Sequence, residues 1–198
     1  MSLDLLIALV GFAFVSSITP GPNNLMLMAS GANFGFRRSL PHMLGISLGH
    51  SFQVTMIGLG LGQLFEIYPT AQLILQIASS AYLLWLAWKI ANAAPPKDGE
   101  AKGKPLTFMQ AAAFQWVNPK AWYMGIYAIT NYTPEGAIWL GALTVAVVFA
   151  YTNFPSIMVW TTIGTQVKRL LSRPALLRAF NWTMAGLLVL TLFPVWFT

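Results

Sequence analysis

The sequence predicts an all-α membrane protein with six transmembrane helices. Of its 198 residues 57% are hydrophobic and only 8% are charged, whereas soluble domains carry about a quarter charged residues. Six apolar stretches each reach or exceed the roughly 20 residues that cross a bilayer as a helix. The alternation in ~10-residue units that marks an outer-membrane barrel is absent. The lipid bilayer is therefore an expected partner, and a separate soluble domain is not expected.

The apolar stretches run over 3–29, 40–65, 70–92, 107–131, 136–163 and 175–197. The first lacks the basic start of a signal peptide and is too long for one, so we expect it to be retained as a helix. The hydrophilic stretch "NAAPPKDGEAKGKP" at 92–105 predicts a loop. We expect a single transmembrane domain over 1–198, in which 1–92 and 107–198 each hold three helices and 93–106 is a cytoplasmic loop.

Ten of the eleven lysines and arginines lie in or directly beside the connections between the predicted helices 1 and 2, 3 and 4, or 5 and 6. Basic loops stay in the cytoplasm. This pattern predicts that both termini lie on the periplasmic or extracellular side. The net charge of +6 is thus explained by topology, and no nucleic acid is expected as a partner.

An odd number of helices in each half requires the second half to cross the membrane in the opposite sense, as inverted repeats do. Helix 1 is interrupted at "TPGPNN" (19–24), and helix 4 at "WVNPKAW" (116–122). Proline removes a backbone donor, so each break frees polar groups that hydrocarbon does not tolerate unpaired. Matched breaks indicate a substrate site near mid-membrane; the alternative is structural kinks repaired by neighbouring helices. The candidate substrate-binding residues are Thr19, Pro20, Gly21, Pro22, Asn23, Asn24, Gln115, Trp116, Asn118, Pro119, Lys120 and Asn153.

Lys120 is the one ionisable side chain deep in an apolar stretch, and no Asp or Glu lies deep in any stretch to neutralise it. A charge within the membrane is by default a candidate for function. We expect its ammonium to bind an anion such as a substrate carboxylate. The alternative is a lysine whose long stem reaches the membrane surface.

Other motifs are weaker. "TNFPS" at 152–156 predicts a third break, in helix 5, which would place Asn153 in the cavity of the substrate site. Trp116 and Trp122 either line that cavity or serve as packing. "GISLG" (45–49) has the spacing of a hydrolase nucleophile elbow but lacks the strand-to-helix turn, so its glycines favour close helix packing. His42 and His50 lack carboxylate partners, which leaves a structural or proton-relay role open. No catalytic residue, metal or cofactor is expected, and there is no cysteine.

At "TPGPNN", followed by "GFRRSL", "GISLG", "AYLLWLAWKIA" and "FQWVNPK", the chain resembles the LysE/RhtB family of bacterial amino-acid exporters over essentially its whole length. It looks most like the cysteine/O-acetylserine exporter subgroup, through "AYLLWLAWKIA" and "LGISLGH". The resemblance implies a secondary transporter of the bacterial inner membrane, not an enzyme. It would export small amino acids or derivatives (cysteine/O-acetylserine, homoserine/threonine or other neutral amino acids) by proton antiport.

Two alternatives remain. One is a divalent-cation or other small-solute exporter of the same superfamily, which the lack of intramembrane carboxylates and thiols disfavours. The other is a membrane enzyme or scaffold, but an enzyme needs an acid–base pair and a scaffold needs no paired breaks. The sequence leaves open the exported amino acid, the number of protons and the oligomeric state, a homodimer included.

Overall fold

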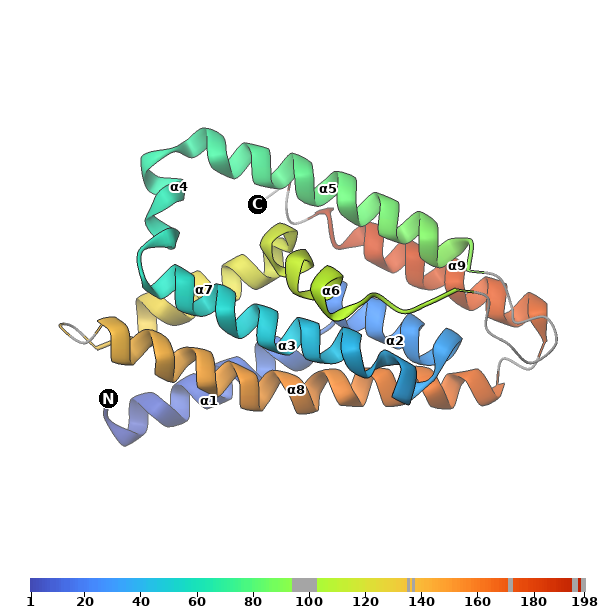
Figure 1. Cartoon of the computed structure of the whole chain (residues 1–198), viewed down its shortest axis with the longest axis horizontal. Helices are drawn as coiled ribbons and strands as arrows, with labels where there is room; N and C mark the ends of the chain where they lie inside the picture. Colours follow the sequence, from blue (N-terminus) through green and yellow to red (C-terminus); the bar gives the residue numbers. More distant parts are fainter. Residues whose placement is uncertain (94–102, 135, 137, 171–172, 194–195, 197–198) are drawn as a thin grey trace.

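Every regular element is helical in the part of the chain that the computed structural model describes, which is 1–93, 103–134, 136, 138–170, 173–193 and 196. The predicted all-α fold class is confirmed for these residues. Figure 1 shows the helices running back and forth along one long axis. The elements are α1 (Leu3–Ile18), α2 (Pro22–Phe34), α3 (Phe36–Gly58), the 3₁₀ turn η1 (Leu61–Gln63), α4 (Leu64–Ile67), α5 (Pro69–Ala91), α6 (Phe108–Phe114), the 3₁₀ turn η2 (Gln115–Val117), α7 (Pro119–Tyr132), α8 (Ile138–Leu170) and α9 (Pro174–Leu190).

Two helices of the described chain are long and apolar enough to cross a membrane, α5 and the Ile138–Val167 part of α8. A third span is reached if α1 and α2, which are bent by 52° at their break, count as one. The other predicted spans are shorter or more polar: α9 has 17 residues, α3 carries buried histidine, serine and glutamine side chains, and 107–131 is divided between α6, η2 and α7. The six-span arrangement therefore stays a prediction.

The helices alternate in direction. α1 and α2 run one way along the axis, α3 returns, α5 runs back, α6 and α7 return, and α8 and α9 follow in opposite senses (Figure 1). The C-terminal ends of α2, α5 and α8 consequently lie at the same end of the bundle, far from the N-terminus. Each of these ends adjoins one of the basic linkers, which are the lysine- and arginine-containing stretches between the predicted helices 1 and 2, 3 and 4, and 5 and 6.

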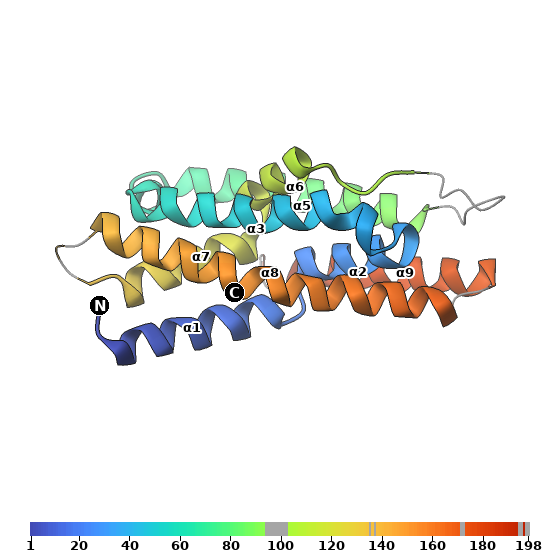
Figure 2. The same ribbon diagram turned by 60° about the horizontal axis from the view of Figure 1, so that its bottom comes forward.

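Figure 2 shows α3, α5 and α6 in one layer above α1, α2, α8 and α9, with α7 between them. Two apolar clusters lie along the long axis of the bundle, one on each side of the C-terminal end of α1. One includes Leu9 and Phe149, and the other includes Met26 and Phe114. The polar residues of the breaks lie between these clusters, so the core itself leaves a polar layer near the middle of the axis.

The breaks predicted in the first and fourth apolar stretches are confirmed, because residues 19–21 separate α1 from α2 and Asn118 precedes α7. The third predicted break, at 152–156, is wrong: α8 continues through Pro155. A single proline frees one carbonyl, here that of Tyr151, and Pro155 lies on an exposed face of the helix. The break in 19–24 combines two prolines with a glycine, which a continuous helix does not accommodate.

The "GISLG" glycines lie inside α3, not at a strand-to-helix turn. A Cβ atom added to Gly49 would stand 2.6 Å from Cα of Ala112, and one added to Gly45 would stand 2.8 Å from Cβ of Ala111. These glycines therefore let α3 and α6 touch along their backbones, which confirms the packing interpretation of the motif. Gly35 and Gly60 instead have positive φ values of 83° and 111° at turns.

Candidate functional site

The break between α1 and α2 has no unpaired backbone carbonyl from residue 15 to residue 21. Hydrocarbon offers no water to such groups, so each of them needs a donor from the protein. The donors come from the break itself and from α7 and α8. They are the Thr19 amide for Val15, the Thr19 hydroxyl for Ser16, the Asn24 amide side chain for Ser17 and Thr19, the Trp160 indole for Ile18, the Lys120 ammonium for Thr19 and Pro20, and the Leu25 amide for Gly21.

Lys120 connects the two breaks directly. Its Nζ donates to the carbonyl oxygen of Thr19 at 2.8 Å, to the Thr19 hydroxyl at 3.0 Å and to the carbonyl oxygen of Pro20 at 3.3 Å. These oxygens stand at the C-terminal end of α1, where the helix dipole is negative. The ammonium therefore points to the break and not to an end of the bundle. Neutral oxygens hold it, where the sequence alone predicted an anion, and no carboxylate contacts it in the described part of the chain.

Gly21 is required by space at this contact. Its backbone is extended, with φ −177° and ψ 178°, which any residue adopts. A Cβ atom at this position would lie 2.7 Å from Cδ and 3.1 Å from Nζ of Lys120. A larger residue would displace the lysine from the break.

An amide network ties the second break to α2 and α3. Gln115, which is fully buried, exchanges two hydrogen bonds with Asn23, of 2.9 and 3.1 Å. The side chain of Gln53 donates to the Gln115 carbonyl at 2.8 Å, and Nδ1 of His50 lies 3.3 Å from the Gln53 side-chain oxygen. Sequence reasoning missed Gln53, because nothing local marks a glutamine in α3 as a partner of residue 115.

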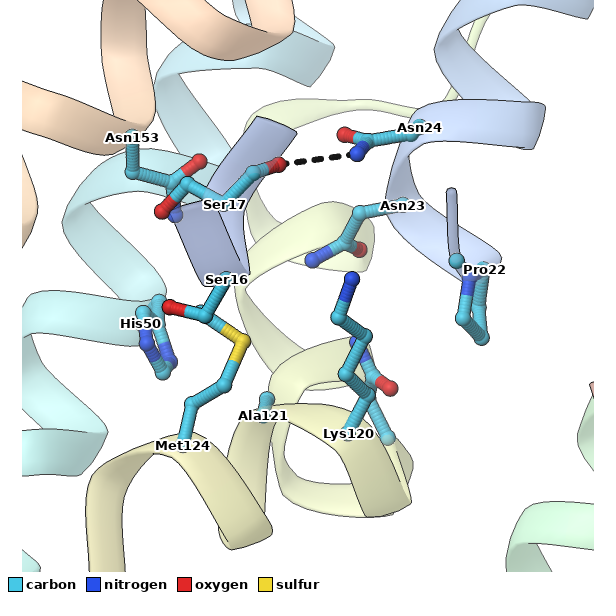
Figure 3. Close-up of a pocket in the computed structure, with 12 residues that line it drawn as sticks. Ser16, Ser17, Pro22, Asn23, Asn24, His50, Lys120, Ala121, Met124 and Asn153 are labelled. Carbon is cyan, nitrogen blue, oxygen red and sulfur yellow. Dashed lines mark hydrogen bonds between the residues drawn. The ribbon is translucent and has the colours of Figure 1, made fainter. Parts of the chain in front are cut away.

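A pocket lies at the level of the breaks, with about 320 Å³ of empty space that is partly open to the outside. Its side chains come from α1, α2, α3, α7 and α8 and point toward a common space (Figure 3). The pocket is lined by Ser16, Ser17, Gly21, Pro22, Asn23, Asn24, His50, Asn118, Lys120, Ala121, Met124 and Asn153.

Three buried polar atoms of this pocket have no hydrogen-bond partner in the described part of the chain: Oγ of Ser17, Nε2 of His50 and Oδ1 of Asn118. An unsatisfied buried polar group costs about 1–3 kcal/mol. Three such groups around one cavity indicate that a polar ligand or water completes them.

Two helix N-termini also face the pocket. α2 begins at Pro22 and α7 at Pro119, and the N-cap residue of neither, Gly21 or Asn118, supplies a side-chain cap. Free amides and the positive end of the helix dipole at such a position attract negative charge. With Lys120 beside them, this part of the pocket favours an anionic group.

Seven predicted residues thus line one pocket: Gly21, Pro22, Asn23, Asn24, Asn118, Lys120 and Asn153. Five do not. Thr19 and Pro20 hold Lys120, Gln115 pairs with Asn23, and Pro119 begins α7. Trp116 packs instead on Trp122, with ring centroids 6.0 Å apart, and its carbonyl accepts a 2.9 Å hydrogen bond from the Trp122 indole.

The prediction missed Ser16, Ser17, Ala121 and Met124, and it left the role of His50 open. Two signals were available in the sequence. Ser16 and Ser17 directly precede the first break, and Ala121 and Met124 follow Asn118 at three-residue spacing, which places them near one face of a helix.

The family model of the LysE type translocator matches residues 14–194. The chain belongs to the LysE-type translocator family. It is 32% identical over 191 residues to the cysteine/O-acetylserine efflux protein of Escherichia coli (strain K12), which covers 96% of each chain. It is 33% identical over 187 residues to the protein of the same name from Shigella flexneri serotype 5b (strain 8401), covering 93% of this chain and 94% of the relative. No solved structure matches the chain.

Membership of this family confirms the resemblance inferred from the sequence. The protein is a membrane transporter and not an enzyme. For a divalent-cation exporter a ligand set would be needed, but no group of three His, Asp or Glu side chains comes together in the residues that the structure describes, and the sequence has no cysteine.

Proposed function

We propose that this translocator exports small amino acids or their derivatives from the cytoplasm, with cysteine and O-acetylserine as first candidates, and that it binds them between its two broken helices. The names of its relatives support these candidates. The pocket supports them as well, because it is small and mostly polar in its side chains and is built around a lysine. Homoserine, threonine and other neutral amino acids have the same charged groups.

The observation that carries the proposal is the position of the Lys120 ammonium, at the edge of the pocket and on the carbonyls of the break. A carboxylate is a stronger hydrogen-bond acceptor for an ammonium than a neutral carbonyl is. A substrate carboxylate would therefore take over donors that now hold Thr19 and Pro20, near the N-termini of α2 and α7. The substrate ammonium would find acceptors in Ser17 and Asn118, whose side-chain oxygens are unpaired.

This exchange gives substrate binding a mechanical effect. The bonds from Lys120 to the break join the start of α7 to the end of α1. A substrate that draws the ammonium away loosens that connection and favours a different arrangement of the two broken helices. A ligand shifts a conformational equilibrium only by such a difference in contacts between the two states.

The proposed arrangement is six crossings in two inverted repeats, 1–92 and 107–198, with the loop 93–106 in the cytoplasm of a bacterium and the protein in its inner membrane. Two features support it. The two proline breaks contact each other near the middle of the long axis (Figure 1), as paired discontinuous helices do in transporters. The helix ends that adjoin the basic linkers lie at one end.

This topology predicts the outcome of reporter fusions in Escherichia coli. Alkaline phosphatase fused after Gly136 should be active, because the connection between α7 and α8 would face the periplasm. The same enzyme fused between α5 and α6 should be inactive there, while green fluorescent protein fused at that point should fluoresce. The reverse pattern would refute the proposed sidedness.

Proton antiport is the proposed driving force. Lys120 and His50 both line the pocket, and both are side chains that can gain or release a proton, as a coupled carrier requires. A proton moving inward would then be exchanged for a substrate moving outward at the same site.

Export should be measured as loss of O-acetyl-L-serine from preloaded proteoliposomes. We expect efflux above that of protein-free liposomes, and faster efflux when the outer medium is made acidic. Efflux at the same rate with and without the proton gradient would exclude antiport but would not contradict export. If O-acetyl-L-serine, cysteine, homoserine and threonine are all retained while Mn²⁺ is lost from the same vesicles, the protein is a cation exporter and the proposal is wrong.

A further inference from the structure

A second pocket lies between the first one and the end of the bundle that adjoins the basic linkers. It has about 530 Å³ of empty space, partly open to the outside, and is formed by α2, α3, the end of α5 and residues 104–106. It is larger than the pocket at the breaks. Nothing in the binding scheme above uses it.

His42 of α3 contributes a buried polar side chain to this pocket. The side chain is 2% exposed, lines the pocket, and has no hydrogen-bond partner at either ring nitrogen in the described part of the chain. A neutral imidazole has one donor and one acceptor, and leaving both unmade in a buried position is unfavourable. A zwitterionic amino acid brings an acceptor in its carboxylate and a donor in its ammonium.

The charge of the pocket is positive. Lys89 and Lys104 line it and are exposed, and no carboxylate is among the lining residues. Asp98 and Glu100 lie outside the described residues. Apolar side chains, among them those of Leu86, Ile90 and Leu106, form much of its wall. Such a cavity fits a small molecule with a carboxylate and a short uncharged side chain.

One face of α2 leads from this pocket to the first. Met26, Ser30 and Asn33 line the second pocket, and Asn23, which lines the first, precedes Met26 at the same helical spacing. Asn23 is bound to Gln115 by two hydrogen bonds. A ligand that moves along α2 toward the breaks therefore meets this amide pair between the two pockets.

We infer that the second pocket is a separate binding site for the exported amino acids, on the side from which they are collected, where Lys89, Lys104 and His42 bind the zwitterion before it passes the Asn23–Gln115 pair. The inference rests on the proposed function. It assigns the pocket a ligand class, a zwitterionic amino acid, and it assigns His42 the role of the buried contact.

The absence of cysteine from the chain allows each pocket to be tested with one introduced thiol. Ser30→Cys places a thiol in the second pocket, and the matched Ser16→Cys places one in the first. Purified protein is treated with methyl methanethiosulfonate, a small neutral reagent, with and without O-acetyl-L-serine. At a ligand concentration about ten times the dissociation constant, mass action leaves about a tenth of the sites empty, so labelling should slow about tenfold.

Both thiols should be protected. His42→Leu should remove protection of the Ser30→Cys thiol and leave that of the Ser16→Cys thiol, and Lys120→Met should do the opposite. The double variant Lys89→Met with Lys104→Met should also weaken protection of the thiol in the second pocket. It alters only exposed side chains, so it tests the same site if His42→Leu does not fold.

Protection of the Ser16→Cys thiol alone would overturn the second site and leave the proposed function intact. Protection in the second pocket that persists in both the His42 and the lysine variants, or that is lost with Lys120→Met, would also overturn it. Lack of protection at both thiols by every amino acid tested would instead refute the proposed function itself.

Discussion

Lys120→Met is expected to leave the protein folded and to abolish the export of O-acetyl-L-serine. Methionine fills a similar volume without a charge. The Thr19 carbonyl keeps its bond from Asn24, so the Pro20 carbonyl is the one carbonyl of the break that loses its donor. A hydrogen bond to a charged group contributes about 1.5–3 kcal/mol, which for a lost substrate contact corresponds to a roughly 10- to 160-fold weaker site. Efflux from proteoliposomes measures export, and elution of the variant as a single species in detergent shows that it is folded.

Lys120→Arg distinguishes charge from proton transfer. Arginine keeps its proton at any relevant pH, so a carrier whose lysine releases a proton should fail with this variant. Export by Lys120→Arg but not by Lys120→Met would show that the residue supplies fixed charge and that another group carries the proton. Arg178→Met, which removes one positive charge from an exposed position of α9, is the control for net charge and should export at the wild-type rate. Wild-type export by Lys120→Met would contradict the proposed binding mode.

The positions of the two breaks could be predicted because proline acts locally. Two prolines around Gly21 remove donors wherever the segment lies, and the need for compensating donors follows from the membrane. The identity of those donors is a tertiary property. The lysine that meets the break is 101 residues from Thr19 in the sequence, and the indole that meets Ile18 is 142 residues away.

The same distinction explains what the sequence prediction misjudged. An uncompensated charge in an apolar stretch predicts a partner, but in this structure three neutral oxygens, and not an anion, accept the hydrogen bonds of the ammonium. Pro155 was expected to break α8, yet the outcome of a single proline depends on whether its face is exposed and how long the helix is. His50 belongs to the site through Gln53 and the Gln115 carbonyl, contacts that no spacing rule contains.

Gly164→Leu is expected to prevent the protein from folding into a stable bundle. A Cβ atom at Gly164 would overlap the Met28 carbonyl group, and one at Gly31 would overlap the Thr161 carbonyl group, so α2 and α8 touch backbone to backbone at two reciprocal points. Overpacking costs about 1–3 kcal/mol where side chains can yield. Here the neighbour is helix backbone, which cannot rotate away, and we expect the cost to exceed that range. The measurement is the fraction of protein that elutes as a single species in detergent, together with its Tm.

The matched control is Gly186→Leu in α9, where an added Cβ meets nothing within 4 Å. It should leave the folded fraction unchanged or raise Tm, because leucine favours the helix more than glycine does. Equal folded fractions for Gly164→Leu and Gly186→Leu would show that α2 and α8 can separate without loss. That result would also weaken the account of the site, because α8 carries both Asn153 of the pocket and the Trp160 indole that satisfies Ile18. Close contact between α2 and α8 is what brings those two side chains to the broken helix.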